Sequence, residues 1–524
     1  MSSTVPSDDE SPGAGTADPS PETLLSLLTE LPAADNAVVL HSAGRTMSLH
    51  AVRHAVDTLA GALVEAGVRQ GVPVGGLVGS GASGVVTMFA VWAADGVYVP
   101  INRRSTPAEI AQLIGETPVE LLVGDADDLA RQTVDLAMVQ FDAITWQPTV
   151  LRPVGAAPAS YDPEVALVLR TSGTTGRPKA VQLRHGGTLA ALDSSLRKLR
   201  RGPTTKPGEQ VTLRVNLIPL SLALWAGIFN TLFSLRAGFG VVLLDTFTPT
   251  ALAEAVRRHG IKSTVLAPAM ITALCDSDAI DSIEPLHIVR SITAPLSPAT
   301  ARRFHDRFGG LVLNSYGQTE LGGEVVGWTV DDIREFGTDK LGAAGRPYDD
   351  VDVRVVDDAG RVLEREEQGH IHIRSPFRMR GYATTDGPGD TRDDGRFADG
   401  FIKTGDIGRL DADGFLWIEG RMSDMINRGG LKVFPDEVEE VLRRHDRVRD
   451  AAVAGVPDPR LGEVPHAWIV PAGPDAPNAE TLSAWCRDHL APYKIPVEYT
   501  VVAGLPRSDV GKVLRRELRA TVEP

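Results

Sequence analysis

Cysteine and basic residues are scarce in this chain. Only two of the 524 residues are cysteine, Cys275 and Cys486. Two distant cysteines exclude a disulfide framework and a structural zinc site, and they fit a reducing cytoplasm. Lys and Arg number 53 against 68 Asp and Glu, which gives a formal net charge of −15. Because no concentrated basic stripe offsets this acidity, we expect no nucleic-acid partner.

Long uncharged runs are also scarce. The run at 215–235 carries no charge, but it contains Asn216, Pro219, Gly227 and Asn230. We predict a buried strand followed by a buried helix there, and no membrane association. Residues 1–22 are acidic and rich in Ser, Pro and Gly, unlike a secretory leader. They predict a disordered tail on a cytoplasmic protein.

The periodicity that is present indicates a mixed α/β protein. Helical spacing follows Ser48, a predicted N-cap, and the helix is expected to stop at Gly67. Short apolar runs that alternate with helices lie at 97–100, 166–169, 241–244 and 264–267. This alternation predicts substantially parallel sheets. After Gly345 a period of two predicts antiparallel strands, with a hairpin turn at Asp413–Gly414.

The predicted fold class is therefore α/β, with more than one domain. We expect a large N-terminal domain of mixed sheets flanked by helices, with a small antiparallel β-barrel-like part, and a small α+β C-terminal domain. The small domain is predicted to contain helices near Pro435 and at 482–489. The locally basic sequence KVLRRELR at 512–519 is interpreted as a solvated helix face.

One short segment has the residue types of a phosphate-binding loop. In ALVLRTSGTTGRPK at 166–179, an apolar strand leads into a loop of Ser, Thr and Gly that ends at Lys179. Glycines let backbone N–H groups approach an anion, hydroxyls add donors and lysine adds a charge, so the segment suits a polyphosphate. The common nucleoside-triphosphatase loop is excluded, because only two residues separate Gly173 from Gly176 and Ala180 follows the lysine. A plain turn is the alternative.

The segment TSGTTGRPKAV resembles the signature loop of the adenylate-forming superfamily. That group comprises acyl- and aryl-CoA synthetases, adenylation domains of nonribosomal peptide synthetases, and luciferases. Four more motifs similar to the family's follow in order: NSYGQTE at 314–320, KTGD at 403–406, GRMSD at 420–424 and LPRSDVGK at 505–512. Five ordered motifs identify the chain as a member of this superfamily.

The resemblance implies the reaction and its reactants. A small-molecule carboxylic acid attacks the α-phosphate of ATP to give acyl-AMP and pyrophosphate, and the acyl group then passes to the thiol of coenzyme A. Because two anions meet, catalysis depends on positioning and charge stabilisation. ATP, Mg²⁺ and coenzyme A are the implied cofactors. The resemblance also implies a domain order: binding domain 23–419, hinge 420–424, and a mobile C-terminal domain 425–524 that carries the catalytic lysine.

The resemblance assigns roles to individual residues. Lys512 would bridge the carboxylate and the α-phosphate, Thr319 would donate to that phosphate, and Glu320 would hold Mg²⁺ with Thr171. The residues implied in ATP and AMP binding are Thr171, Ser172, Gly173, Thr174, Thr175, Gly176, Lys179, Ala294, Pro295, Asn314, Ser315, Tyr316, Gly317, Thr319, Asp406, Arg421 and Lys512. Within this set Tyr316 would stack on adenine and Asp406 would accept both ribose hydroxyls. A buried structural tyrosine and a turn aspartate are the alternatives.

Other residues are implied in the acid pocket, the hinge and the acceptor tunnel. The implied pocket residues are Trp225, Ile292, Thr293 and Gly317. Asp424 would be the hinge, and Gly429 and Gly430 would line a tunnel for the incoming thiol. For Trp225 the alternative is core packing, and for Gly429–Gly430 it is a turn before a strand at 432–434.

The sequence departs from the family's pattern at the pocket. The run at 219–222 lacks the usual histidine or aromatic gate, and neither Leu220 nor Ser221 can pair with an α-amino group. Ile292 and Thr293 replace two glycines, which predicts a narrow pocket for an aryl or short acid. These departures leave the acceptor open: a carrier-protein thiol, an amine or nitrite in a diazo-forming reaction are alternatives to coenzyme A. A non-enzymatic scaffold is disfavoured, because the five motifs keep their charged residues. The oligomeric state stays open.

Overall fold

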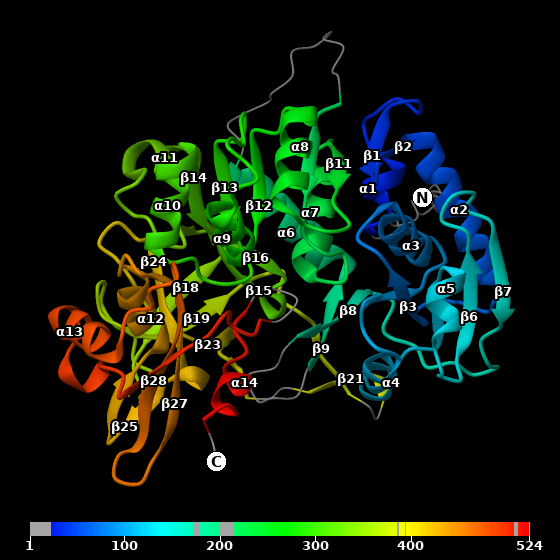
Figure 1. Ribbon diagram of the computed structural model, residues 1–524. Helices are drawn as coiled ribbons and strands as arrows, with labels where there is room; N and C mark the ends of the chain where they lie inside the picture. Colours follow the sequence, from blue (N-terminus) through cyan, green and yellow to red (C-terminus); the bar gives the residue numbers. More distant parts are fainter. Residues whose placement is uncertain are drawn as a thin grey trace, which may run out of the picture.

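The computed structural model describes residues 22–171, 179–199, 213–384, 387–392, 395–507 and 512–522. A large part made of mixed sheets and helices is followed by a smaller C-terminal part, drawn in orange and red in Figure 1. The α/β class predicted from the sequence is confirmed. The predicted tail falls outside the described residues except for Glu22.

The largest sheet of the described chain has nine strands in the order β21-β20-β9-β8-β4-β3-β5-β6-β7. Its members are β3 (Pro73–Val78), β4 (Val97–Asn102), β5 (Leu121–Gly124), β6 (Ala137–Phe141), β7 (Pro148–Arg152), β8 (Val165–Thr171), β9 (Lys179–Arg184), β20 (Gly381–Thr384) and β21 (Gly387–Arg392). Its central strands β8, β4, β3, β5 and β6 are parallel, whereas β9 runs antiparallel to β8. The predicted phosphate loop therefore connects the two strands of the β8–β9 hairpin, in which Thr171 pairs with Lys179.

Helices and two smaller, largely parallel sheets also belong to the large part. The helices are α1 (Ser26–Thr29), α2 (Leu49–Glu65), α3 (Ala82–Ala93), α4 (Pro107–Glu116), α5 (Ala126–Ala130), α6 (His185–Leu199), α7 (Trp225–Arg236), α8 (Pro249–His259), α9 (Pro268–Asp276) and α10 (Pro298–Phe308). One sheet contains β10 (Val215–Ile218), β11 (Gly240–Leu243), β1 (Val38–Ser42) and β2 (Arg45–Ser48), and the other contains β12 (Ser263–Leu266), β13 (Ile288–Ser291) and β14 (Leu311–Asn314). The Ser48 side chain accepts from Ala51 N–H, so the predicted N-cap is confirmed.

The uncharged run at 215–235 folds as β10 followed by α7, as predicted. Helix α7 has 12 residues, most of them buried. Among the residues that the structure describes, no helix is long and apolar enough to cross a membrane.

Antiparallel strands follow the parallel layers. They form a sheet of β15 (Tyr316–Gln318), β16 (Gly323–Gly327) and β17 (Arg346–Pro347), and another of β18 (Asp352–Val356), β19 (Gly369–Arg374), β22 (Phe397–Ala398), β23 (Phe401–Leu410) and β24 (Leu416–Arg421). The short helix η1 (Thr319–Leu321) lies between β15 and β16, and α11 (Val330–Phe336) follows β16. Strands β23 and β24 pair across the predicted Asp413–Gly414 turn, where Gly414 has φ +83°.

The C-terminal part has its own sheet and core. The sheet contains β25 (Ile426–Arg428), β26 (Leu431–Val433), β27 (Val448–Asp458), β28 (Gly462–Pro471) and β29 (Glu498–Val501), and the helical segments are α12 (Pro435–Arg443), α13 (Ala479–His489), η3 (Pro492–Lys494) and α14 (Arg515–Arg519). The short helix η2 (Met422–Asp424) connects β24 to this part. A buried cluster that includes Ile426, Leu442 and Leu482 lies between this sheet and its helices. The interpretation of 512–519 as a solvated helix face is wrong for Arg515, which is half-buried and forms ion pairs with three carboxylates.

Candidate active site

The NSYGQTE motif lies where β14 ends and the chain turns into β15 and η1. Asn314 is the last residue of β14 and is buried. Its Nδ2 donates to the carbonyls of Leu296 and Gly342, at 3.1 Å each, which ties two loops to the strand end. Its Oδ1 is buried without a hydrogen-bond partner. A buried acceptor without a donor fits a ligand N–H group, such as the amino group of adenine.

A hydrogen-bonded carboxylate lies beside this turn. Asp406 on β23 is 3% exposed, and its Oδ2 accepts from the Tyr316 hydroxyl at 2.5 Å and from Gln318 Nε2 at 2.7 Å. Arg421 Nε donates to Oδ1 at 2.8 Å. Burial, together with the Asp406 charge, raises the pKa of Tyr316 well above its usual value, so the phenol stays a donor. These bonds leave acceptor capacity on the carboxylate, as ribose hydroxyls would require.

A second buried carboxylate lies on η1. Glu320 accepts from Tyr382 at 3.2 Å and from Arg396 Nη1 at 3.1 Å, and both contacts fall on Oε1. The Tyr382 ring also lies 4.9 Å from Lys179 Nζ. The far end of the predicted phosphate loop therefore lies beside Glu320. Of that loop, Ser172, Gly173, Thr174, Thr175 and Gly176 lie outside the described residues.

The donor set at this point fits Mg²⁺. Magnesium prefers oxygen ligands and binds through one or two carboxylates together with substrate phosphates. Glu320 supplies a carboxylate, and Thr171 supplies a hydroxyl at the other end of the loop hairpin. The described residues contain no group of three or more His, Cys, Asp or Glu placed to hold a metal. A bound Mg²⁺ would therefore need the phosphates of the nucleotide as further ligands.

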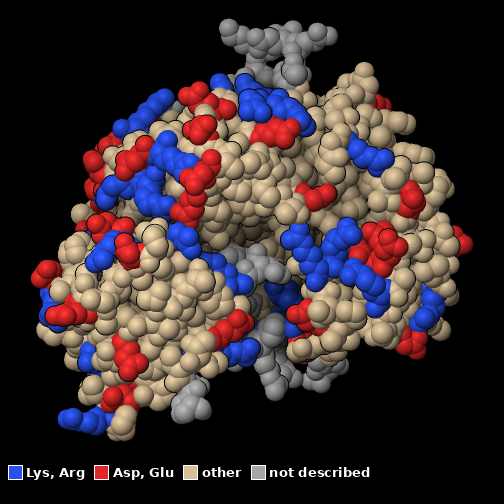
Figure 2. Space-filling model, viewed as in Figure 1, with Lys and Arg blue, Asp and Glu red and all other residues tan. Residues whose placement is uncertain are grey.

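Lys512 reaches this site from the C-terminal part. Burial lowers the pKa of its ammonium group, and the nearby Arg421 lowers it further. Asp406, Glu320 and Asp424 act in the opposite direction, because their negative charges favour the ammonium form. The lysine is thus an electrostatic neighbour of the two buried carboxylates of the large part. Figure 2 shows that the molecule is hollowed where the two parts meet, with Lys and Arg side chains at its margin.

Two of the predicted pocket residues, Trp225 and Gly317, are connected through Phe229 and Gly323. The Trp225 and Phe229 rings meet edge to face, with centroids 5.4 Å apart. Phe229 packs so closely on Gly323 that a Cβ there would lie 2.8 Å from its ring. Gly323 O in turn lies against Gly317, where a Cβ would clash at 2.1 Å. Gly317 therefore needs to be glycine at this close backbone approach.

The segment after β13 is conformationally unusual. Thr293 has φ +78°, in the left-handed region that β-branched residues rarely adopt. The preceding Ile292 packs against a buried cluster of Leu220, Val265 and Ala267. Ala294 and Pro295 follow before β14, and Ser315 N–H donates to Ser291 O at 3.0 Å. This bond joins the segment to the NSYGQTE turn. Strained backbone of this kind is concentrated at functional sites.

The predicted hinge and tunnel residues differ in their positions. Asp424 ends η2 and contacts Arg515 of the C-terminal part at 3.1 Å. Gly429 and Gly430 form the turn between β25 and β26, with φ +59° and +93°. Gly429 N–H donates to Leu461 O, and Gly430 N–H donates to Asn427 Oδ1. The contacts described for this turn all lie within the C-terminal part, so this arrangement does not bring the two glycines to the site.

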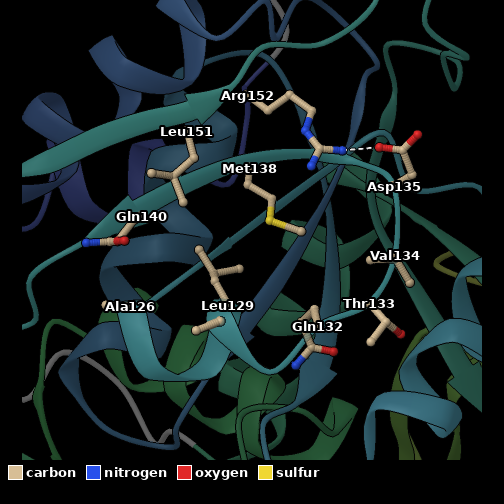
Figure 3. Close-up of a pocket in the computed structure, with 11 residues that line it drawn as sticks. Ala126, Leu129, Gln132, Thr133, Val134, Asp135, Met138, Gln140, Leu151 and Arg152 are labelled. Atoms are coloured by element: carbon tan, nitrogen blue, oxygen red, sulfur yellow. Dashed lines mark hydrogen bonds and ion pairs between the residues drawn. The ribbon is translucent and has the colours of Figure 1, made fainter.

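A separate pocket of about 450 Å³ lies between α5, β6 and β7 (Figure 3). Leu129, Met138 and Leu151 point into it, and the Asp135–Arg152 ion pair lies at one side. Its described lining contains no residue that the sequence analysis assigned to a site.

The site and fold agree with comparisons to known proteins. The chain matches the AMP-binding enzyme family over residues 31–383 and the AMP-binding enzyme C-terminal domain over residues 437–512. It therefore belongs to the AMP-binding enzymes and is an adenylate-forming ligase. A 2-succinylbenzoate–CoA ligase of Bacillus velezensis is 34% identical over 68% of each chain. A feruloyl-CoA synthase of an Amycolatopsis species is 31% identical over 92% of this chain and 96% of its own.

A solved structure supports the same conclusion. The amide bond synthetase McbA from Marinactinospora thermotolerans matches with a TM-score of 0.79 and 29% identity, over 95% of this chain and 100% of its own. ATP use follows from the family. The relatives support the activation of a carboxylic acid followed, in general, by formation of a CoA thioester.

Three residues of this site were not predicted from the sequence. Gln318 lies inside the NSYGQTE motif and donates to Asp406, so the motif itself contained the signal. Arg396 and Tyr382 contact Glu320 from segments more than 60 positions away. No local spacing connects them with Glu320, and only the tertiary structure reveals the contact.

Proposed function

We propose that this enzyme activates a compact aryl or short acyl carboxylic acid to acyl-AMP and transfers it to coenzyme A. The observation that carries the proposal is the pair of buried carboxylates with their hydrogen-bond partners, Asp406 with Tyr316 and Glu320 with Arg396. Lys512 of the C-terminal part lies within electrostatic range of both carboxylates. A buried ammonium group at this point offsets the repulsion between a carboxylate and the α-phosphate.

The proposed steps divide the work among the chain's own groups. Asp406 accepts the ribose hydroxyls while Tyr316, Gln318 and Arg421 hold the carboxylate in place. Lys512 lies between the acid and the α-phosphate and stabilises the negative charge that develops as the carboxylate oxygen attacks phosphorus. Pyrophosphate leaves toward the loop that ends at Lys179. Mg²⁺, held by Glu320 and Thr171, would neutralise phosphate charge.

A compact acid is favoured by the pocket wall. Trp225 and Phe229 occupy one side, and Ile292 with the strained Thr293 occupies the segment where the resembling family has two glycines. A side chain at each of these positions takes volume from the pocket. The test is ATP–pyrophosphate exchange across benzoate, cinnamates and straight-chain acids of increasing length. Preference for the long-chain acids would refute the proposed substrate class.

An amine acceptor is the second candidate, because the amide bond synthetase McbA matches 95% of this chain at 29% identity. The run at 219–222 also lacks the histidine or aromatic gate. Acyl-AMP formed by the enzyme should be divided among coenzyme A, a holo carrier protein, an amine and nitrite. Mass spectrometry of the products identifies the acceptor, and thioester formation with coenzyme A alone supports the proposal.

A further inference from the structure

A cluster of charged side chains around the buried Glu439 takes no part in the proposed chemistry. Its centre is Arg515 in α14, whose side chain is 18% exposed. Its Nη2 donates to Glu439 at 2.7 Å and to Asp436 at 3.0 Å, both on α12. Its Nε donates to the carbonyl of Val453 at 3.0 Å. These contacts fix the guanidinium within the C-terminal part.

The remaining nitrogen of Arg515 reaches the hinge. Nη1 donates to Asp424 Oδ2 at 3.1 Å. Burial is the main cause that raises the pKa of Asp436, and the charges of Glu439 and Asp424 add to it. A positive charge at this point offsets the repulsion among the carboxylates of Asp424, Asp436 and Glu439. The planar guanidinium of Arg515 can donate a hydrogen bond to each of them.

Arg515 lies three residues after Lys512 on one short segment. Val513 pairs with Arg507 as an isolated bridge, and Leu514 N–H donates to Pro506 O at 2.9 Å. Val513 also packs against the buried Trp468 cluster. One end of the segment is thus held at Asp424 by Arg515, while the other end places Lys512 within electrostatic range of Asp406 and Glu320.

We propose that Arg515 is a positioning residue: by binding the hinge carboxylate of Asp424, it holds the C-terminal part in the arrangement that buries Lys512 at the junction. This inference rests on the proposed role of Lys512 in the reaction. A rotation of the C-terminal part at the hinge has to break or rebuild the Arg515–Asp424 contact. The contact therefore favours the adenylation arrangement over the one used for acyl transfer.

The first test measures the burial of Lys512 without any reaction. The full chain is labelled with trace acetic anhydride, and acetylation of Lys512 is measured by mass spectrometry relative to the exposed Lys262. In Asp424→Asn and Arg515→Lys, we expect Lys512 labelling to rise about tenfold, the shift expected when one charge-assisted hydrogen bond is lost. The double variant should rise no further, because both changes remove the same contact.

Arg443→Lys is the matched control. Arg443 is buried in the same cluster and bonds Glu439 and Asp450, and its described contacts do not include Asp424. Its substitution should leave Lys512 labelling at the wild-type level. Unchanged labelling in Asp424→Asn, or an equal rise in Arg443→Lys, would overturn the inference, since the cluster would then only stabilise the fold.

The second test separates the two half-reactions. With the acid that the exchange panel shows to be accepted, Arg515→Lys should lower acyl-AMP formation about tenfold and leave acyl transfer from synthetic acyl-AMP to coenzyme A unchanged. An equal loss in both half-reactions would contradict a positioning role. If Lys512→Ala retains full acyl-AMP formation while the labelling results stand, the proposed function fails and the positional role of Arg515 survives.

Discussion

Replacing Thr293 with glycine tests whether the left-handed backbone beside the pocket is strained. Thr293 has φ +78°, and a residue with a Cβ loses roughly 1–2 kcal/mol in this region. Glycine removes that cost. It also raises the conformational entropy of the unfolded chain, which lowers the free energy of unfolding by about 0.5–1 kcal/mol. We therefore expect Thr293→Gly to be about 0.5–1 kcal/mol more stable than Thr293→Ala, which keeps the Cβ.

Urea unfolding of the two variants, followed by tryptophan fluorescence, measures this difference in unfolding free energy, provided that the two variants show the same dependence on urea concentration. Thr293→Gly should also widen the pocket wall, so exchange rates with longer acids should rise relative to benzoate. If Thr293→Ala is as stable as Thr293→Gly, the reasoning from backbone strain is refuted. If chain-length preference does not change in Thr293→Gly, the segment does not bound the pocket.

Three further predictions concern single residues. Ser48→Ala removes the N-cap bond of α2 and should cost about 1 kcal/mol of unfolding free energy, measured by urea denaturation; no loss would contradict the cap. Tyr316→Phe removes the hydroxyl bonded to Asp406 and should raise the Kd for ATP about tenfold, as measured by calorimetry. An unchanged Kd would contradict a role of the Tyr316–Asp406 hydrogen bond in nucleotide binding. Burial lowers the pKa of His185 to about 4, so between pH 6.5 and 4 the unfolded chain binds more protons and stability falls by about 2–3 kcal/mol. His185→Gln should lose less stability over that range, and an identical loss would show that other groups dominate.

Local chemistry made much of the fold predictable. The Ser48 cap and the Asp413–Gly414 turn depend on residues within a few positions of each other, and both are present. The uncharged run at 215–235 could be assigned to a strand and a helix because its Asn, Pro and Gly residues argue against a span.

Contacts between distant segments were not predictable in the same way. Asp406 meets Tyr316 across 90 positions, and only the resemblance to a family pointed to their proximity. Arg515 meets Asp424 across 91 positions and Glu439 across 76. Its segment KVLRRELR is locally basic, which favours a solvated face, whereas the tertiary structure pairs Arg515 with three carboxylates.

In the proposed reaction, Lys512 acts on the reacting groups and does not serve mainly to bind ATP. The most direct test of this role compares Lys512→Ala with the wild type in two measurements: acyl-AMP formation, followed by pyrophosphate exchange, and ATP binding, followed by calorimetry. We expect Lys512→Ala to lose most acyl-AMP formation while its ATP binding stays largely intact, because the ammonium group stabilises charge that develops only during the attack. Undiminished acyl-AMP formation in Lys512→Ala would contradict this role.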